Sequence, residues 1–363
     1  MKFVDEFRDP DAARALAERI RRAADGAPTM RFMEVCGGHT MAIHRFGIPH
    51  LLPDNIELLS GPGCPVCVTP STYIDRAIEL AEQDAERPVT LTTFGDLYRV
   101  PGGSESLEDA AGRGLDVRIV YSPRDALKTA AENPGHDVLF LGVGFETTVP
   151  TVAATIMEAR AEGLSNFRVL SGHKTMPQAL RALMEAPEVA LHGFLLPGHV
   201  STISGPEPYR FLPREFGTAC CVTGFEPSDI LQGVLALTEQ VAEERPTVEN
   251  RYRRAVHADG NPTARRVVET VFEPADSQWR GLGMIPDSGL DVREEWRDHA
   301  VDPPDPAAPS VEHDRCLCTQ VLRGVARPTD CSLFGTACVP DSPIGPCMVS
   351  SEGACAAFHK YGT

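Results

Sequence analysis

One pattern recurs along most of this chain: a short run of residues typical of a β-strand, then a glycine-rich turn, and in most cases a helix-like segment. The runs include RFMEV before CGGHT, IELLS before GPGCPVC, VLFLGV before GFETT and GFLLP before GHVSTISG. Their spacing is close to one β-α unit, which is typical of parallel sheets whose strands are joined by crossover helices. The pattern therefore predicts an α/β protein.

Eight such units are more than one small open sheet is expected to hold, so we predict two α/β domains. A single eight-stranded barrel is the competing architecture. The helix-poor segment ENPGH, residues 132–136, is taken as the boundary, which places the domains at residues 31–134 and 135–258. Before them, residues 9–25 predict an amphipathic helix, and beyond about residue 274 the β-α pattern stops.

Charge and hydropathy argue against nucleic-acid and membrane partners. The chain of 363 residues carries 34 Lys and Arg against 51 Asp and Glu, a formal charge of -17, which repels polyphosphate backbones. We therefore expect no nucleic-acid partner. Charges occur every few residues in the first segment, unlike a signal peptide, and no apolar stretch approaches the length of a membrane span. We expect a cytoplasmic protein without membrane contact.

Eleven cysteines are unusual for a cytoplasmic chain, because reducing compartments do not favour structural disulfides. Six of them lie within the last part of the chain: Cys316, Cys318, Cys331, Cys338, Cys347 and Cys355. Buried small side chains or disulfides would not explain this density, so bound metal is favoured. The gaps are mostly longer than those of zinc knuckles, and an iron-sulfur cluster is preferred over zinc.

The pair Cys64 and Cys67 forms a C-x-x-C motif, which is compatible with a redox couple, half of a zinc site or a structural disulfide. A position ahead of a helix would lower the pKa of a thiol and favour two-electron thiol-disulfide exchange. Cys36 follows another predicted strand, with two glycines and then His39, so a thiolate and an imidazole could serve a soft transition metal. Cys220 and Cys221 are interpreted as core residues.

Ligands of open parallel sheets bind at the carboxyl ends of the strands, where these glycine-rich turns are predicted to lie. The polar residues of the turns are therefore candidate site residues: Cys36, His39, Thr40, Cys64, Cys67, Asp96, Arg99, Glu146, His173, Lys174, His199 and Ser201. The turns GVGFETT and GPGCPVC lack both the dinucleotide glycine pattern and a Walker lysine, so we predict no standard nucleotide site.

Taken together, eight motifs resemble the HypD family, the iron-sulfur maturation factors of [NiFe]-hydrogenases. They are CGGHT at 36–40, GPGCPVC at 61–67, FGDLYRVPG at 94–102, GFETT at 144–148, SGHK at 171–174, PGHVS at 197–201, GFEPSDI at 224–230 and GPCMVSSEGAC at 345–355. The resemblance covers nearly the whole chain, in order.

The resemblance implies a scaffold for assembly of the Fe(CN)2CO unit, in stable complex with a HypC-type chaperone and with cyanide delivered by a HypE-type donor. Cys36 would hold the iron with His39 beside it, and Cys64 and Cys67 would be the redox-active pair. A [4Fe-4S] cluster would be bound by the C-x14-C-x6-C-x16-C set, namely Cys316, Cys331, Cys338 and Cys355. Cys318 remains an alternative first ligand and Cys347 is unassigned. Asp96, Glu146, His173, His199 and Glu352 would support the site.

The family fold implies two similar α/β domains and a third domain around the cluster. The third domain would combine an N-terminal helix, in residues 1–30, with residues 259–363. Two other functions remain open: a free-standing iron-sulfur disulfide oxidoreductase resembling ferredoxin-thioredoxin reductase, and a zinc-stabilised binding module without a redox role.

Overall fold

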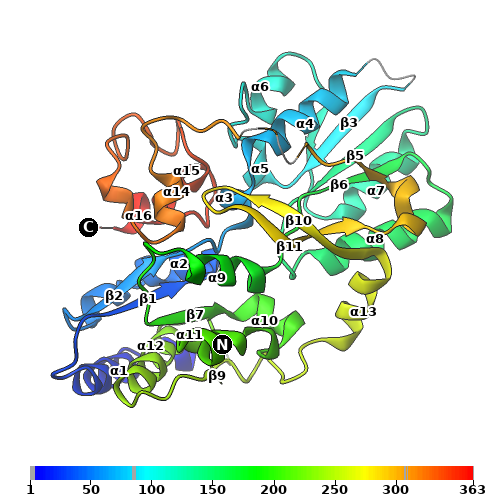
Figure 1. The fold of residues 1–363 in the computed structure, drawn as a ribbon. Coiled ribbons are helices and arrows are strands. Elements are labelled where there is room, and N and C mark those ends of the chain that lie inside the picture. Colours follow the sequence, from blue (N-terminus) through cyan, green and yellow to red (C-terminus); the bar gives the residue numbers. More distant parts are fainter. Residues whose placement is uncertain (1–4, 84–86, 306–307, 309, 363) are drawn as a thin grey trace.

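Two five-stranded parallel sheets form the framework of the chain in a computed structural model that describes residues 5–83, 87–305, 308 and 310–362 (Figure 1). The first sheet has the strand order β2 (Ile56–Ser60), β1 (Met30–Glu34), β7 (Gly193–Pro197), β8 (Ala219–Thr223), β9 (Val248–Asn250). The second has the order β12 (Ala300–Val301), β6 (Phe167–Ser171), β5 (Asp137–Gly142), β3 (Val89–Thr93), β4 (Val117–Ile119). The prediction of two parallel-sheet α/β units is confirmed, and a single barrel is excluded.

The chain is divided between the sheets differently from the prediction. It builds β1 and β2 of the first sheet, then four strands of the second, and returns to the first for β7, β8 and β9. A boundary between residues 134 and 135 separates β4 from β5, although β3 pairs with both of them. The predicted domains 31–134 and 135–258 must therefore be corrected. The segment at 132–136 is only the turn between a helix and β5, and local sequence does not reveal which strands pair across a long crossover.

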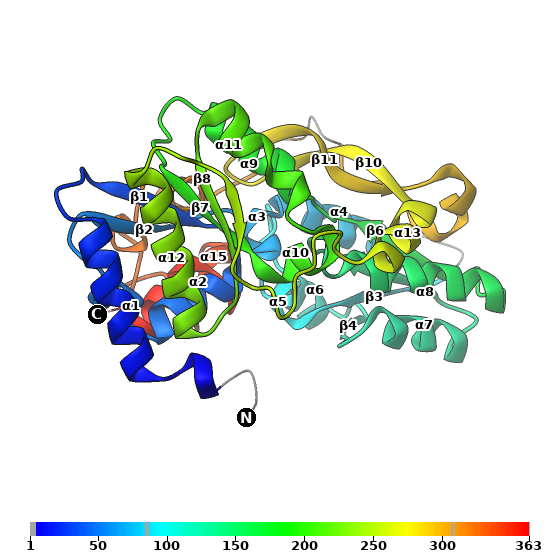
Figure 2. The same cartoon turned by 90° about the horizontal axis from the view of Figure 1, so that it is seen from below.

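Helices cover the faces of both sheets (Figures 1 and 2). Up to β9 they are α1 (Pro10–Ala23), α2 (Gly37–Arg45), α3 (Pro65–Val68), α4 (Ser71–Glu82), α5 (Gly95–Tyr98), α6 (Leu107–Gly112), α7 (Pro123–Glu132), α8 (Val149–Glu162), α9 (Met176–Glu185), α10 (Gly198–Ser204), α11 (Phe211–Phe216) and α12 (Pro227–Ala242). Short 3-10 helices are η1 (Asp5–Phe7), η2 (Ile48–Leu51) and η3 (Glu207–Tyr209). Within the described ranges, no helix is both long enough and apolar enough to cross a membrane.

The N-terminal helix α1 packs on the first sheet unit. Its start is capped by the Asp9 carboxylate, which accepts a hydrogen bond from the Asp11 backbone N–H at 2.8 Å. Its apolar stripe, including Ile20, shares a buried cluster with residues of α12 such as Val234, and Figure 2 shows the two helices side by side. The prediction that this helix packs with the C-terminal domain is therefore wrong. Residues 1–4 of that predicted segment lie outside the described residues.

The predicted C-terminal domain, residues 259–363, also divides in two. Its first part has α13 (Pro262–Val271), the antiparallel hairpin β10 (Phe272–Trp279) and β11 (Gly283–Val292), η4 (Glu294–His299) and β12. This part belongs with the second sheet, because β12 pairs with β6 and the hairpin residue Phe272 shares a cluster with β5 and β6. The second part, residues 314–362, is called here the cysteine-rich segment. It contains α14 (Cys318–Leu322), η5 (Pro328–Asp330), α15 (Pro346–Val349) and α16 (Ala354–Tyr361).

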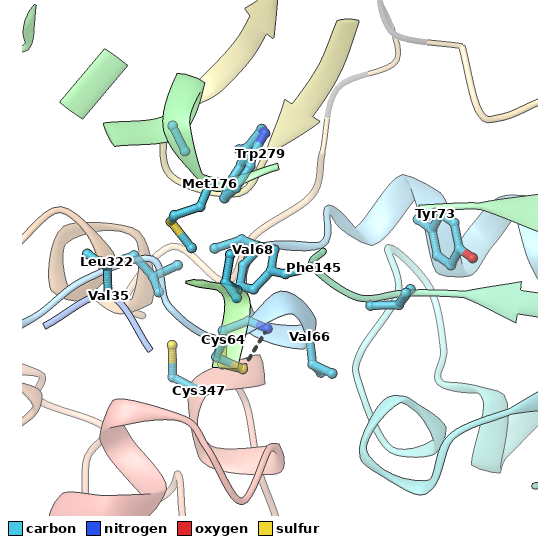
Figure 3. Packing of buried hydrophobic residues seen from close by; sticks show 14 of the residues in the cluster. Val35, Cys64, Val66, Val68, Tyr73, Phe145, Met176, Trp279, Leu322 and Cys347 are labelled. Carbon is cyan, nitrogen blue, oxygen red and sulfur yellow. Dashed lines mark hydrogen bonds between the residues drawn. A yellow bond between two sulfur atoms is a disulfide. The ribbon is translucent and has the colours of Figure 1, made fainter. Parts of the chain in front are cut away.

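The largest hydrophobic cluster lies where the two sheets and the cysteine-rich segment meet (Figure 3). Val35 follows β1 of the first sheet, Phe145 follows β5 of the second, and Leu322 comes from α14. Trp279, at the end of β10, stacks on Phe145 with ring centroids 5.9 Å apart. Burial of these large side chains holds the three parts in fixed relation and brings the carboxyl ends of several strands together.

Candidate functional site

Cys36 lies at the carboxyl end of β1 and immediately precedes α2. The backbone of the loop after β2 contacts it closely: the Gly37 N–H donates to the Gly63 carbonyl at 2.9 Å. A Cβ atom on Gly63 would lie 2.1 Å from the backbone nitrogen of Cys36, so only glycine allows this approach. The first two strands therefore place the Cys36 and Cys64 turns in direct contact.

The Cys36 side chain is a free thiol that remains partly exposed. Burial of the surrounding site raises the pKa of this thiol to about 12, and the Glu352 carboxylate acts in the same direction. The backbone N–H groups of His39 and Gly38, in the first turn of α2, act in the opposite direction. The thiol is therefore protonated at neutral pH. A metal cation bound in place of the proton would stabilise the thiolate, which burial otherwise disfavours.

Glu34, the last residue of β1, was not selected from the sequence, but its side chain holds the Cys36 turn by hydrogen bonds. It is 2% exposed, and its carboxyl oxygens accept hydrogen bonds from the Cys36 backbone N–H at 3.1 Å and the Thr40 hydroxyl at 2.6 Å. Burial raises the pKa of Glu34 to about 8. A carboxylate directly before the Cys36 turn, after three apolar residues and Arg31 in β1, was the available sequence signal.

His39 is fully buried beside Cys36. Its Nε2 lies 3.2 Å from the Thr223 carbonyl and 3.0 Å from the Gly224 carbonyl, which assigns the ring proton to Nε2. Burial lowers the pKa of His39 to about 4, so the ring is neutral. Phe225, which the sequence analysis also missed, lies between two imidazoles, with centroids 4.7 Å from His39 and 4.0 Å from His199.

Cys64 and Cys67 form a disulfide, with Cα atoms 5.2 Å apart. Cys64 caps the short helix α3, and its sulfur accepts a hydrogen bond from the Cys67 backbone N–H at 3.2 Å. Both side chains are buried. The Cys67 sulfur lies 3.9 Å from the Pro346 carbonyl of the cysteine-rich segment. The predicted proximity of the two sulfurs is thus present, and their redox activity remains a prediction.

A single pocket inside the cysteine-rich segment is lined by all six of its cysteines: Cys316, Cys318, Cys331, Cys338, Cys347 and Cys355. Two of them are paired, because the sulfurs of Cys318 and Cys347 lie 2.6 Å apart. The thiol of Cys347 lowers the pKa of Cys318 by hydrogen bonding to it, and the pKa of Cys347 is raised for the same reason. A hydrogen bond with Cys355 also raises the pKa of Cys347, so the pair interacts with one of the other four cysteines.

The other four cysteines, Cys316, Cys331, Cys338 and Cys355, fit an iron-sulfur cluster by the chemistry of their donors, because they are free thiols that line one pocket. Among the described residues, no group of three or more His, Cys, Asp or Glu side chains is arranged to hold one metal ion. These two observations agree, because each thiolate of a cubane cluster binds its own iron, so the sulfurs need not converge on one point.

Carboxylates connect Cys36 with the cysteine-rich segment. Asp96, in the short helix α5 after β3, accepts hydrogen bonds from the Ser350 and Ser351 hydroxyls, both at 3.2 Å. Glu352 packs on Gly37, where an added Cβ would lie 2.4 Å from the Glu352 Cβ. Burial raises the pKa of Glu352, and the Asp96 carboxylate adds to this effect. Both predicted supporting residues therefore lie at the same junction as Cys36.

The remaining candidates separate into two groups. Glu146 accepts a hydrogen bond from the Met176 N–H at 3.0 Å, and burial raises its pKa to about 7. His173 and Lys174 instead lie in a second pocket below the β10–β11 hairpin. The Lys174 Nζ donates to the Ser277 hydroxyl and the Gln278 carbonyl, each at 2.7 Å. The structure therefore shows these two residues anchoring the hairpin.

A family model for HypD, described as the hydrogenase formation hypA family, matches residues 11–362. HupD of Azotobacter chroococcum mcd 1, a hydrogenase expression/formation protein, is 48% identical over 375 residues, covering 100% of this chain and 97% of that protein. The hydrogenase maturation factor HypD of Azotobacter vinelandii is 48% identical with the same coverage. HypD of Escherichia coli (strain K12) is 45% identical over 369 residues, covering 99% of this chain and 98% of that protein.

Proposed function

This chain belongs to the HypD family of hydrogenase maturation factors, and from that premise we propose that it is the scaffold on which the Fe(CN)2CO unit is assembled. The observation that supports this most is the position of Cys36. Its thiol is partly exposed, its backbone N–H donates to the buried Glu34 carboxyl, and its turn contacts Gly63, which precedes the Cys64–Cys67 disulfide. A thiolate is a suitable ligand for the soft low-spin iron of such a unit.

The chain's own residues would bind the iron cargo as follows. Cys36 would lose its thiol proton on binding iron, and the Gly38 and His39 backbone N–H groups would stabilise the resulting sulfur charge. The Nδ1 of His39 is buried and has no hydrogen-bond partner among the described residues, so it is available as an acceptor beside the cargo. A HypC-type chaperone would share the iron in a stable complex, and a HypE-type protein would deliver cyanide transiently, all in the cytoplasm.

A [4Fe-4S] cluster held by Cys316, Cys331, Cys338 and Cys355 would supply electrons one at a time. The disulfide of Cys64 and Cys67 takes up two electrons and two protons to become two thiols, and it releases them in reverse. Cys318 and Cys347 lie in the same pocket as the proposed ligands, and Pro346, next to Cys347, contacts Cys67. This arrangement supports a relay of thiol pairs from the cluster pocket toward Cys36.

The experiment is an infrared spectrum and an iron and sulfide count of the protein, purified anaerobically with its small partner. Wild-type protein should show cyanide and carbonyl bands and about four cluster irons. The Cys36→Ala variant should lose the bands and keep the cluster. The matched control is Cys221→Ala, since Cys221 is a buried core thiol of β8. Bands that persist in Cys36→Ala would refute the assignment of Cys36 as the iron ligand.

The second candidate function is a free-standing disulfide oxidoreductase. The disulfide beside a cysteine-lined pocket favours it, but Cys64 and Cys67 are only 3% and 0% exposed, so a disulfide of another protein cannot reach them without a rearrangement. A reductase should turn over a disulfide substrate by itself. A scaffold should instead copurify with a small partner in a fixed ratio.

A further inference from the structure

A buried arginine contacts the segment that carries the Cys64–Cys67 disulfide. Arg280 directly follows β10 and is 4% exposed. Its Nε donates to the Thr69 carbonyl at 3.0 Å, and its Nη1 pairs with the Glu312 carboxylate. Its Nη2 is buried and has no hydrogen-bond partner among the described residues. A buried charge with a free donor is costly, so its presence here requires an explanation.

The backbone of Arg280 binds the same segment. Its N–H donates to the Val68 carbonyl at 2.8 Å, and Val68, the last residue of α3, directly follows Cys67. Trp279, which precedes Arg280, belongs with Val68 to one buried cluster (Figure 3). Helix α3 has four residues, so it is only about 6 Å long. A charge held at its end therefore acts on both sulfurs of the disulfide.

The residue after Arg280 contacts the cysteine-rich segment. A Cβ atom added to Gly281 would lie 3.1 Å from the Thr319 carbonyl oxygen and 3.2 Å from the Thr319 Cα. Thr319 directly follows Cys318, whose sulfur lies against that of Cys347. Arg280 therefore lies between the disulfide and the second thiol pair, where the proposed relay passes.

The charge of Arg280 is only partly balanced by its partner. The Arg280 side chain is 3% exposed, whereas the Glu312 side chain is 30% exposed. Water therefore screens the carboxylate more than the guanidinium. The guanidinium is also the group that contacts the end of α3. The ion pair thus leaves a net positive potential at the disulfide.

Reduction of a disulfide needs such a potential when the sulfurs are buried. Two electrons break the S–S bond, and the sulfurs take up two protons, or one where one sulfur stays a thiolate. Burial disfavours a thiolate, whereas a nearby arginine stabilises it. Because Cys64 and Cys67 are 3% and 0% exposed, the protein has to supply the stabilising charge that water would otherwise give.

We propose that Arg280 is the buried cation that stabilises the thiolate formed when the Cys64–Cys67 disulfide is reduced. The proposal rests on the redox role given to this pair above. It makes Arg280 a positioning residue, because its hydrogen bonds hold the end of α3 while its charge favours the reduced pair. The electrons come from the proposed cluster or, in the experiment below, from dithiothreitol, which is oxidised to its cyclic disulfide.

The test measures the reduction potential of the pair in the full-length protein, purified anaerobically and equilibrated with mixtures of reduced and oxidised dithiothreitol. Alkylation followed by mass spectrometry gives the reduced fraction. At about pH 9, Arg280→Met should lower the equilibrium constant for reduction on the order of tenfold, which is about 30 mV for two electrons. At about pH 6, where both sulfurs carry protons, the difference should be much smaller. A purely structural role would give a difference that does not depend on pH.

Two further variants separate charge from packing. Arg280→Lys keeps the positive charge and should restore most of the wild-type potential. Glu312→Gln removes the opposing carboxylate, so it should raise the equilibrium constant for reduction at about pH 9, the opposite direction from Arg280→Met. Glu312→Gln also keeps the inference testable if Arg280→Met does not fold.

Other titratable groups on the elements packed around α3 are those of Cys36, Glu146, Lys174, Cys318 and Cys347. All three variants retain them, so their titration cancels when variants are compared. The inference is overturned if Arg280→Met and Glu312→Gln both match the wild type at about pH 9, or if Arg280→Lys shifts as far as Arg280→Met. A pair that stays oxidised in every dithiothreitol mixture would instead refute its redox role in the proposed function.

Discussion

The sulfur atoms of Cys318 and Cys347 lie 2.6 Å apart in the buried part of the cysteine-rich segment, although 29 positions separate the two residues. Both residues line one pocket together with the other four cysteines of the segment. Cys347 also follows Pro346, whose carbonyl contacts the Cys67 sulfur at 3.9 Å. The pair thus lies between the pocket and the Cys64–Cys67 disulfide.

The family's C-x14-C-x6-C-x16-C spacing predicts which cysteines hold the cluster. Cys316→Ala should lose iron and sulfide, because it removes one of four thiolate ligands, while Cys318→Ala should retain about four irons per chain. Anaerobic iron and sulfide analysis with the visible absorption spectrum checks both variants. The reverse result, with the cluster lost only in Cys318→Ala, would assign Cys318 as the first ligand.

The same contact predicts a role in electron transfer between thiols. Cys347→Ala should keep the cluster but slow the reduction of the Cys64–Cys67 disulfide by a low-potential one-electron reductant, because an intermediate thiol pair is missing. Alkylation of free thiols at successive times, followed by mass spectrometry, gives the rate. The control is Cys220→Ala, since Cys220 is a buried thiol of β8 whose sulfur lies 3.6 Å from the Thr218 carbonyl. Equal rates in the two variants would contradict the relay.

Gly63 predicts a steric requirement at the Cys36 turn. In Gly63→Ala the new Cβ would lie 2.1 Å from the Cys36 nitrogen, so the two turns must separate, at a cost of about 1–3 kcal/mol in the free energy of unfolding. The control is Gly112→Ala at the end of α6, where nothing lies within 4 Å of the new atom and helix propensity favours alanine. Urea unfolding of both variants checks the difference. Equal stability would contradict the close approach.

Burial of Lys174 predicts a pH dependence of stability. Desolvation lowers its pKa from 10.5 to about 7 in the folded protein. Between these values the unfolded chain binds more protons, so this residue's contribution to stability rises with pH, by at most about 1.4 kcal/mol per pH unit. Lys174→Met lacks that contribution, and its stability relative to wild type should therefore fall as the pH rises from about 7 to about 10.

Urea unfolding across this pH range measures the effect. Lys128→Met is the matched control, because the Lys128 side chain is 74% exposed and pairs only loosely with Glu132 at 3.7 Å. Its stability relative to wild type should change little over the same range. A parallel response of the two variants would show that Lys174 titrates as an exposed lysine does.

Much of the site could be predicted from local patterns. Strand-turn-helix spacing predicts parallel sheets, and because ligands bind where the strands of such sheets end, Cys36, His39 and Glu146 were expected at strand ends. The C-x-x-C spacing likewise predicts that Cys64 and Cys67 can approach, since three residues of separation limit how far apart the sulfurs can lie. These are consequences of short-range geometry.

Contacts between distant segments needed the tertiary structure. The chain contributes strands to the first sheet, then to the second, and then to the first again. Helix α1 packs on α12, and the predicted contact of this helix with the C-terminal domain is not formed. The pairing of Cys318 with Cys347 and the position of Phe225 between two histidines arise in the same way.

The sequence by itself therefore determined the α/β class, the strand-end residues and the cysteine spacing, because backbone periodicity and turn chemistry act over a few residues. Only the tertiary structure decided which strands share a sheet, which cysteines touch and which polar groups are left without partners. Those outcomes depend on the burial of apolar surface between elements that are far apart in the chain. Each element contributes only part of that surface, so its local sequence does not reveal which partner covers it.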